Sequence, residues 1–85
     1  MPDLTAYIDG QISRFQKELC DFLRIPSIST NPSHAGDVRE CAEWVADHLH
    51  AAGIEKSEVI ETDGHPIVLG EHWISDDAPT VLIYG

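Results

Sequence analysis

A short, uninterrupted apolar run near the end of the sequence most constrains what this chain can fold into. The run is Thr80-Val-Leu-Ile-Tyr84, followed by Gly85. Half-exposed strands alternate apolar and polar residues, whereas a continuous apolar run is typical of strands covered on both faces. The run therefore predicts a buried strand with neighbours on both edges, as in an open α/β sheet. In such sheets, ligand-binding and catalytic groups lie just beyond the carboxyl ends of the strands.

Two amphipathic helices are expected upstream of this strand. In the first, apolar residues recur at helical spacing over Leu4–Leu23, with polar residues on the opposite side. Asp3 can cap its N-terminus, and Pro26 ends the pattern because it disfavours helical geometry at the preceding residue. Residues 27–36 are turn formers without periodicity and indicate a loop. The apolar face of the helix implies that it lies against another element.

The second helix is predicted from Asp37 to Ala52. Asp37-x-x-Glu40 resembles a capping box, in which the Asp37 carboxylate accepts an amide hydrogen bond from the first turn. Both acidic side chains also lie near the positive end of the helix dipole, which stabilises them. Gly53 then supplies the C-terminal stop.

The spacing of apolar residues becomes strand-like after the second helix. Ser57–Thr62 predicts a short strand, Asp63-Gly64 a turn, and Pro66–Glu71 a second strand that pairs with the first as a hairpin. Ser75–Pro79 is a further cluster of turn formers, before the apolar run at 80–84. The predicted order is helix, helix, strand, strand, strand, which places the chain in the α/β class.

The charge of the chain excludes several classes of function. Its 85 residues include 15 Asp and Glu against 5 Lys and Arg, a formal charge of −10 at pH 7. Nucleic acids and anionic membranes are bound through clustered basic residues, so neither partner is expected. The sequence has no run of about 20 apolar residues and no secretory signal pattern, so we expect a cytoplasmic location. The length allows one small domain or a piece of a larger one.

Several acidic and histidine side chains invite a metal-binding hypothesis, but each has a simpler interpretation. Glu43, Asp47 and His50 share one face of the second helix, which is also its solvent-facing stripe. His48 lies about 200° from His50 around the helix axis and cannot chelate with it. The other histidines lack the spacing of a metal motif and are expected at the surface: His34, His65 and His72.

The serines, cysteines and tryptophans also suggest no site. Ser27 and Ser29 lie outside a Gly-x-Ser-x-Gly elbow, so we expect them to form turn hydrogen bonds. Without a Cys-x-x-Cys spacing, the cysteines are expected as reduced, partly buried thiols on separate helices: Cys20 and Cys41. Packing is the expected role of the tryptophans, Trp44 and Trp73. From the residues alone, we assign no catalytic, cofactor-binding or metal-binding residue.

Five segments nevertheless form a recognisable pattern through their order and spacing. They are Phe22-Leu-Arg-Ile-Pro-Ser-Ile-Ser29, Asp37–Gly53, Val59–Gly64, Pro66–Glu71 and Ala78–Gly85. This pattern resembles the start of the two-zinc dipeptidases, which form one metallopeptidase family with carnosinase, acetylornithine deacetylase and succinyl-diaminopimelate desuccinylase. The resemblance covers nearly the whole chain. It implies that residues 1–85 are the opening part of a zinc-peptidase-like α/β/α catalytic domain.

In that family, the strand similar to Thr80–Tyr84 is followed by a His-x-Asp motif, whose His binds one zinc ion and whose Asp bridges two. A glutamate general base comes from a later segment, and a water held by the two ions attacks a peptide or amide carbonyl. The resemblance implies a dipeptide or acyl amino acid substrate and allows a homodimeric parent protein. None of these ligands matches a residue of this chain. We therefore expect an N-terminal fragment that is inactive alone and binds no zinc.

Two other interpretations remain open. The chain could be a small acidic structural or interaction module without catalytic activity, whose exposed apolar strand edge recruits a partner by strand addition. It could also be a small metal-binding protein that uses Glu43, Asp47 and His50.

Overall fold

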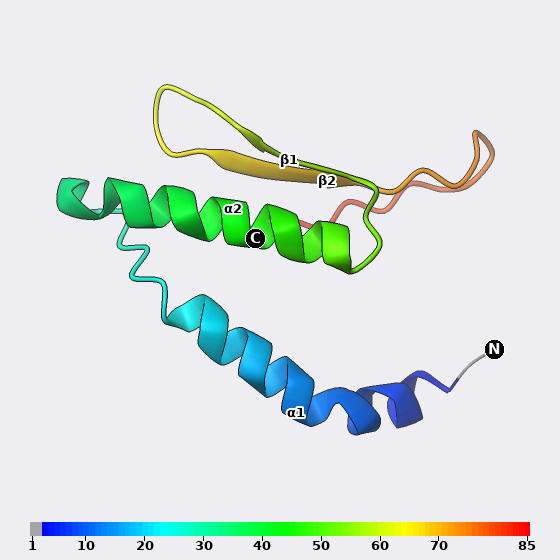
Figure 1. The fold of residues 1–85 in the computed structure, drawn as a ribbon. Coiled ribbons are helices and arrows are strands. Elements are labelled where there is room, and N and C mark those ends of the chain that lie inside the picture. The colour runs from blue at the N-terminus through cyan, green and yellow to red at the C-terminus, as the bar shows by residue number, and fades with distance from the viewer. Residues whose placement is uncertain (1–2) are drawn as a thin grey trace.

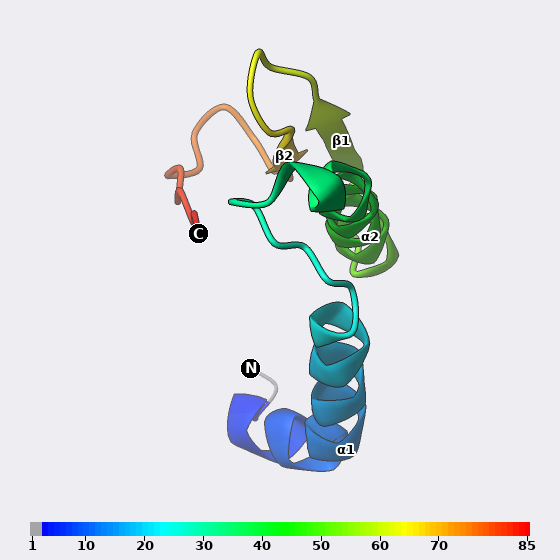
Figure 2. The same cartoon turned by 90° about the vertical axis from the view of Figure 1, so that its left-hand side faces the viewer.

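The computed structural model describes residues 3–85 and contains helices together with one antiparallel β-hairpin (Figure 1). This mixture is compatible with the α/β class in a general sense. In both cartoon views α2 lies along the hairpin, and α1 extends away from this pair (Figures 1 and 2). The elements are α1 (Leu4–Leu23), the 3-10 turn η1 (Pro32–His34), α2 (Ala35–Ala51), β1 (Lys56–Ile60) and β2 (Ile67–Glu71).

The first helix, α1, has the predicted bounds. The Asp3 carboxylate caps it by accepting hydrogen bonds from the amides of Thr5 and Ala6, at 3.0 and 3.3 Å. At its other end the amide of Arg24 still donates to the carbonyl of Cys20, before Pro26 prevents a further turn. Both ends are set by residues adjacent in sequence, and the prediction for this helix is confirmed.

The second helix, α2, begins two residues before the predicted start. The side chain of Asn31 accepts a hydrogen bond from the amide of Ser33 and caps the start of η1. The 3-10 turn η1 is followed directly by α2. Asp37 therefore lies inside the first turn, where its carboxylate contacts Nδ1 of His34 at 2.8 Å. The prediction that Asp37 caps α2 was wrong, because η1 already supplies the preceding turn.

Gly53 ends α2 as predicted. Its φ of 103° lies in the left-handed region that favours glycine. The amide of Gly53 donates to the carbonyl of His50, and the amide of Ile54 donates to the carbonyl of Leu49, both at 3.0 Å. These two hydrogen bonds form a Schellman motif, which satisfies the last carbonyls of the helix and turns the chain toward β1.

The predicted hairpin is present. β1 pairs with β2 in antiparallel register, from Lys56 opposite Glu71 to Ile60 opposite Ile67. The first strand is shifted toward the N-terminus relative to the predicted Ser57–Thr62, because Thr62 belongs to the loop. There its hydroxyl donates to the carbonyl of His65 at 2.7 Å and accepts the amide of Gly64 at 3.0 Å.

The core of the protein lies between α2 and the hairpin. Among residues 3–85, the buried hydrophobic side chains are Ala42 and Ala46, each 8% exposed. The Ser57 hydroxyl donates to the carbonyl of Ala46 at 3.0 Å and joins β1 to α2. On β2, a Cβ placed on Gly70 would lie 3.1 Å from methyl groups of both Leu49 and Ile54. Small residues on both sides therefore allow the helix to lie close to the strands.

The predicted strand at 80–84 is not formed, and this prediction was wrong. The chain turns at Ser75–Ala78 as expected, but the run that follows has no regular secondary structure. The side chains of Val81–Tyr84 are 80–92% exposed. A strand of this composition is stabilised by cover on both faces, and the described helices provide none for it. The hairpin is therefore the sheet of residues 3–85.

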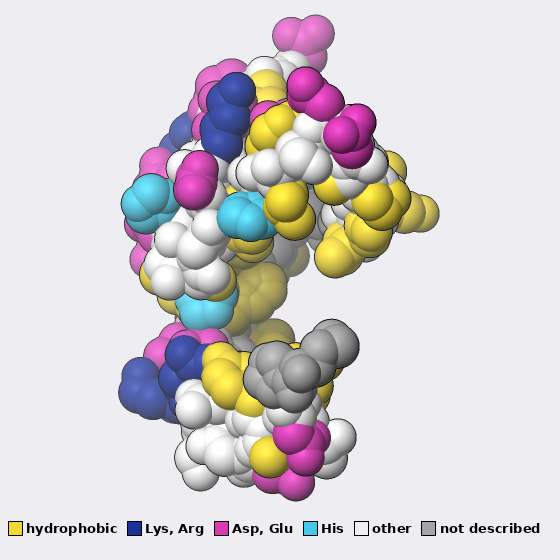
Figure 3. Space-filling model, turned by 90° about the vertical axis from the view of Figure 1, so that its right-hand side faces the viewer, with side chains coloured by type: hydrophobic (Ala, Val, Ile, Leu, Met, Phe, Trp, Pro, Cys, Tyr) yellow, Lys and Arg dark blue, Asp and Glu magenta, His cyan; other side chains and the backbone are white. Residues whose placement is uncertain are grey.

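Large apolar surfaces remain uncovered as a result. None of the residues of α1, all of which the structure describes, is buried. Figure 3 shows hydrophobic side chains gathered on the side of the C-terminal segment. The exposed large hydrophobic residues of that segment are Trp73, Ile74, Val81, Leu82, Ile83 and Tyr84.

The close approach at Gly70 leads to a prediction for stability. Gly70→Val should lower the free energy of unfolding by about 1–2 kcal/mol, because its methyl groups would overlap Leu49 and Ile54. Gly36→Ala is the matched control, since the space around Gly36 is open and a helical alanine is favoured over glycine. Urea denaturation of both variants measures the effect. A Gly70→Val variant as stable as the wild type would contradict the tight packing of α2 on β2.

Candidate functional site

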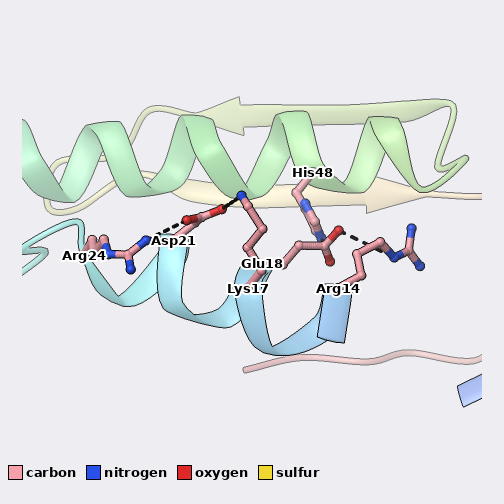
Figure 4. Close-up of polar contacts among 6 residues, drawn as sticks. All are labelled: Arg14, Lys17, Glu18, Asp21, Arg24 and His48. Carbon is pink, nitrogen blue, oxygen red and sulfur yellow. Dashed lines mark hydrogen bonds and ion pairs between the residues drawn. The ribbon is translucent and has the colours of Figure 1, made fainter. Parts of the chain in front are cut away.

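The main contact between α1 and the rest of the protein is a small mixed cluster of polar and aromatic side chains. Figure 4 shows its polar part. His48 points from α2 toward Glu18 on α1, and its Nε2 atom lies 3.3 Å from Oε2 of Glu18. The other carboxylate oxygen of Glu18 lies 3.9 Å from Nε of Arg14, one turn earlier on α1. Glu18 thus lies between a histidine and an arginine.

Aromatic stacking forms the second half of this cluster. The ring of Phe22 on α1 stacks on Trp44 of α2, with centroids 5.4 Å apart and planes 27° apart. Trp44 also stacks on His48, with centroids 4.7 Å apart and planes 9° apart. Such pairs contribute about 0.5–1.5 kcal/mol beyond the area they bury. We call these four residues, Glu18, Phe22, Trp44 and His48, the docking cluster.

A groove of about 430 Å³ lies beside the docking cluster, between α1 and the end of α2. The hydroxyl of Tyr7 accepts a hydrogen bond from Arg14 at 3.1 Å within this groove. The full lining is Tyr7, Arg14, Phe15, Glu18, His48, Ala51 and Ala52. The groove is lined by one acidic, one basic and one histidine side chain, so its surface is partly polar. The lining includes neither an evident nucleophile nor a set of metal ligands.

A second ionic group stabilises the last turns of α1. The carboxylate of Asp21 accepts hydrogen bonds from Lys17 at 2.8 Å and from Arg24 at 2.9 Å. The hydrogen bond from Lys17 is the main reason that the pKa of Asp21 is lowered, with a smaller contribution from Arg24. Both pairs follow the i, i+3 or i, i+4 spacing, so they stabilise the helix rather than form a binding site.

Two further contacts hold the hairpin loop in place. Arg39 on α2 donates a hydrogen bond to the Glu61 carboxylate, which lowers the pKa of Glu61 and raises the pKa of Arg39. Nε2 of His65 lies 2.8 Å from the carbonyl of Ser29, in the segment between α1 and α2. The loop at 61–66 is therefore tied both to α2 and to the connection that precedes it.

The structure places the side chains that the sequence singled out in several different regions. Glu43, Asp47 and His50 are exposed on α2, so the predicted exposure of this stripe is confirmed. His48 and His50 have different surroundings, as their angular separation predicted, because only His48 belongs to the docking cluster. His34 was expected at the surface but is partly buried against Asp37.

The remaining candidates are also dispersed. Trp44 packs as predicted, whereas Trp73 is 74% exposed, so the packing prediction was wrong for it. Cys41 is a partly buried free thiol, but Cys20 is exposed, contrary to its prediction. His72 and Ser27 are exposed. These side chains do not converge on a common site.

The sequence analysis missed the docking cluster, although a local signal for it exists. Glu18 and Phe22 on α1 are four residues apart, and so are Trp44 and His48 on α2. Residues four apart lie on one helical face, so each helix presents one aromatic ring and one titratable group side by side. That equal spacing allows the two pairs to meet when the helices cross.

The described residues do not fit a two-zinc centre. Within residues 3–85, no group of three or more His, Cys, Asp or Glu side chains lies close enough together to hold a metal ion. The contacts Glu18–His48 and His34–Asp37 each bring together two donors, which is fewer than a protein zinc site uses. Likewise, none of the helices in this range is long and apolar enough to cross a membrane.

The chain was compared with protein-family models, with curated proteins and with solved structures, and none of these comparisons found a match.

The stacked rings lead to a prediction for the attachment of α1. Trp44→Ala removes both stacking contacts, so α1 should separate from α2 more often, and trypsin should cut at Arg14, Lys17 and Arg24 about 2- to 10-fold faster. Trp73→Ala is the control, since Trp73 is exposed and should leave cleavage unchanged. Equal cleavage of wild type and Trp44→Ala would show that the stack does not hold α1.

The contact between Arg39 and Glu61 leads to a prediction for pH dependence. Because pairing lowers the pKa of Glu61, the contact stabilises the folded chain above the ordinary glutamate range, and this stabilisation is lost as the pH falls through the lowered pKa. Glu61→Gln should therefore reduce the urea midpoint at about pH 7, and its difference from the wild type should shrink as the pH falls below the ordinary glutamate range. Glu58→Gln, on the exposed side of β1, should have no such effect. A Glu61→Gln difference that persists at low pH would contradict this account.

Proposed function

We propose that this chain is the N-terminal part of the catalytic domain of a cytoplasmic two-zinc dipeptidase or related amide hydrolase. Two observations support the proposal. The first is the resemblance, in order and spacing, of the segments from Phe22 to Gly85 to the start of that family. The apolar run at 80–84, which has the composition of a central strand, is exposed and unpaired in residues 3–85. The exposed run is the observation that carries the proposal, because it is suited to a place inside a larger sheet.

In this proposal the role of the chain is structural. α2 covers one face of the larger sheet to which the hairpin and residues 80–84 belong. The apolar face of α1 packs on further parts of the same domain. The strand formed by residues 80–84 directs the segment that follows it toward two zinc ions. The metal ligands and the general base come from other segments, so no residue of this chain has a catalytic role. The substrate is a dipeptide or an acyl amino acid, and the parent protein can be a homodimer.

A second candidate function rests on the edges of the hairpin. A two-stranded sheet has two edges with unpaired backbone groups, and such edges pair with added strands. In this alternative, the chain is an acidic interaction module that binds an extended segment of a partner. The open edges of the hairpin favour this candidate. An interaction module does not, however, account for the resemblance to the dipeptidases.

Measurements of zinc binding and amide hydrolysis test the first proposal. The chain of residues 1–85 alone should hydrolyse no dipeptide and show no two-site zinc isotherm. The coding sequence after the Gly85 codon, read in frame or after one disrupted base, should encode His-x-Asp. The protein extended by that sequence should hydrolyse dipeptides or acyl amino acids, lose this activity to a chelator and regain it with zinc.

The outcomes separate the two candidates. Turnover or two-site zinc binding by residues 1–85 alone would contradict the structural role. A stop codon or unrelated sequence after Gly85 would contradict the dipeptidase proposal and favour the interaction module. In that case, size-exclusion chromatography should show association of the chain through its open edges.

A further inference from the structure

The docking cluster contains one side chain whose charge changes near neutral pH. His48 is 42% exposed and Glu18 is 29% exposed, so water and protons reach both groups. Histidine side chains ordinarily gain their proton near about pH 6.5 and glutamates near about pH 4.3. When both are ionised, the two side chains that face each other across the α1–α2 contact carry opposite charges.

The His48 ring lies against Trp44, in the last turn of α2. Trp44 stacks on the imidazole ring at 4.7 Å and fixes its orientation, and an aromatic face attracts a cation. His48 lies in the last turn of α2, where the helix dipole also favours positive charge. From α1, the ionisable groups on this side are Glu18, Arg14 and Tyr7. Nε of Arg14 lies 3.9 Å from Oε1 of Glu18, whereas His48 lies near the other oxygen, Oε2, so the two cations contact different carboxylate oxygens.

The attachment of α1 depends strongly on this contact. Besides the pair Glu18–His48, the aromatic contact between the two helices is Phe22 on Trp44, and no residue of α1 is buried. An interface this small gives little stability on its own. A change of a few fold in its strength therefore changes the fraction of molecules in which α1 is docked.

We propose that His48 and Glu18 form a pH-sensitive latch, which docks α1 on α2 most firmly when His48 is protonated and Glu18 is ionised. A charged histidine donates its Nε2 hydrogen to the carboxylate and adds an electrostatic attraction that neutral imidazole lacks. Loss of the proton weakens the contact and opens the groove beside Arg14 and Tyr7. This inference does not depend on the proposed hydrolase function.

Paramagnetic relaxation measures the docking directly. In a Cys41→Ser background, Cys20 is the single cysteine, and it is exposed on α1, where it can carry a nitroxide label. The label enhances relaxation of α2 amide protons in proportion to the docked fraction. The ratio of docked to undocked chains should be about 1.5- to 5-fold higher at about pH 5.5 than at about pH 8, as expected for one exposed ion pair. It should fall again at a pH low enough to protonate carboxylates, and the effect should weaken at high salt.

Three variants decide the role of the latch. His48→Gln should abolish the change in docking between about pH 8 and about pH 5.5, and Glu18→Gln should abolish it as well. His50→Gln is the matched control, because His50 is exposed on α2 outside the docking cluster and should leave the profile unchanged. Circular dichroism checks that all three variants keep their helices. A wild-type profile without pH dependence, or a His48→Gln profile identical to the wild type, would overturn the proposal.

Discussion

The packing of α2 against the hairpin is the contact on which the rest of the structure depends. Ala42 and Ala46 present small side chains to the strands, and Gly70 leaves room for Leu49 and Ile54. Because the helix can lie this close, the Ser57 hydroxyl reaches a carbonyl of α2. The Schellman turn at Gly53 connects the two elements without a long loop. The other parts of the chain are attached to this unit by few contacts.

The remaining apolar surface is the most informative property of the protein. Full burial of one large aliphatic or aromatic side chain stabilises a protein by about 1.5–3 kcal/mol, and the exposed residues Val81–Tyr84 gain none of this. The same holds for much of the apolar face of α1. Cover from further elements would add stability at both places. A formal charge of −10 at pH 7 opposes association between separate chains through electrostatic repulsion.

Local features of the fold could be predicted from the sequence, and features that depend on distant contacts could not. The cap at Asp3, the stop before Pro26 and the turn at Gly53 depend on near neighbours, and all three were predicted correctly. The start of α2 was predicted two residues late, because the pattern at Asp37 looked like a cap while η1 already led into the helix.

The strand at 80–84 and the candidate site show the limit of prediction from sequence. A strand requires a partner, and the composition of the run gives no information on whether one is present among the described residues. The contact of Glu18 with His48 likewise depends on the angle and position at which α1 crosses α2. Knowing which face of α2 carries His48 does not determine that geometry. The helical spacing of the sequence shows which side chains share a face of each helix. It does not show which side chains of α1 contact which side chains of α2.

Amide hydrogen exchange of the whole chain, followed residue by residue, tests the central claim that α2 and the hairpin form the stable unit. The account predicts the strongest protection in α2, β1 and β2, weaker protection in α1, and no protection over residues 80–84. Protection over 80–84 equal to that of the hairpin, or stronger protection in α1 than in α2, would contradict it.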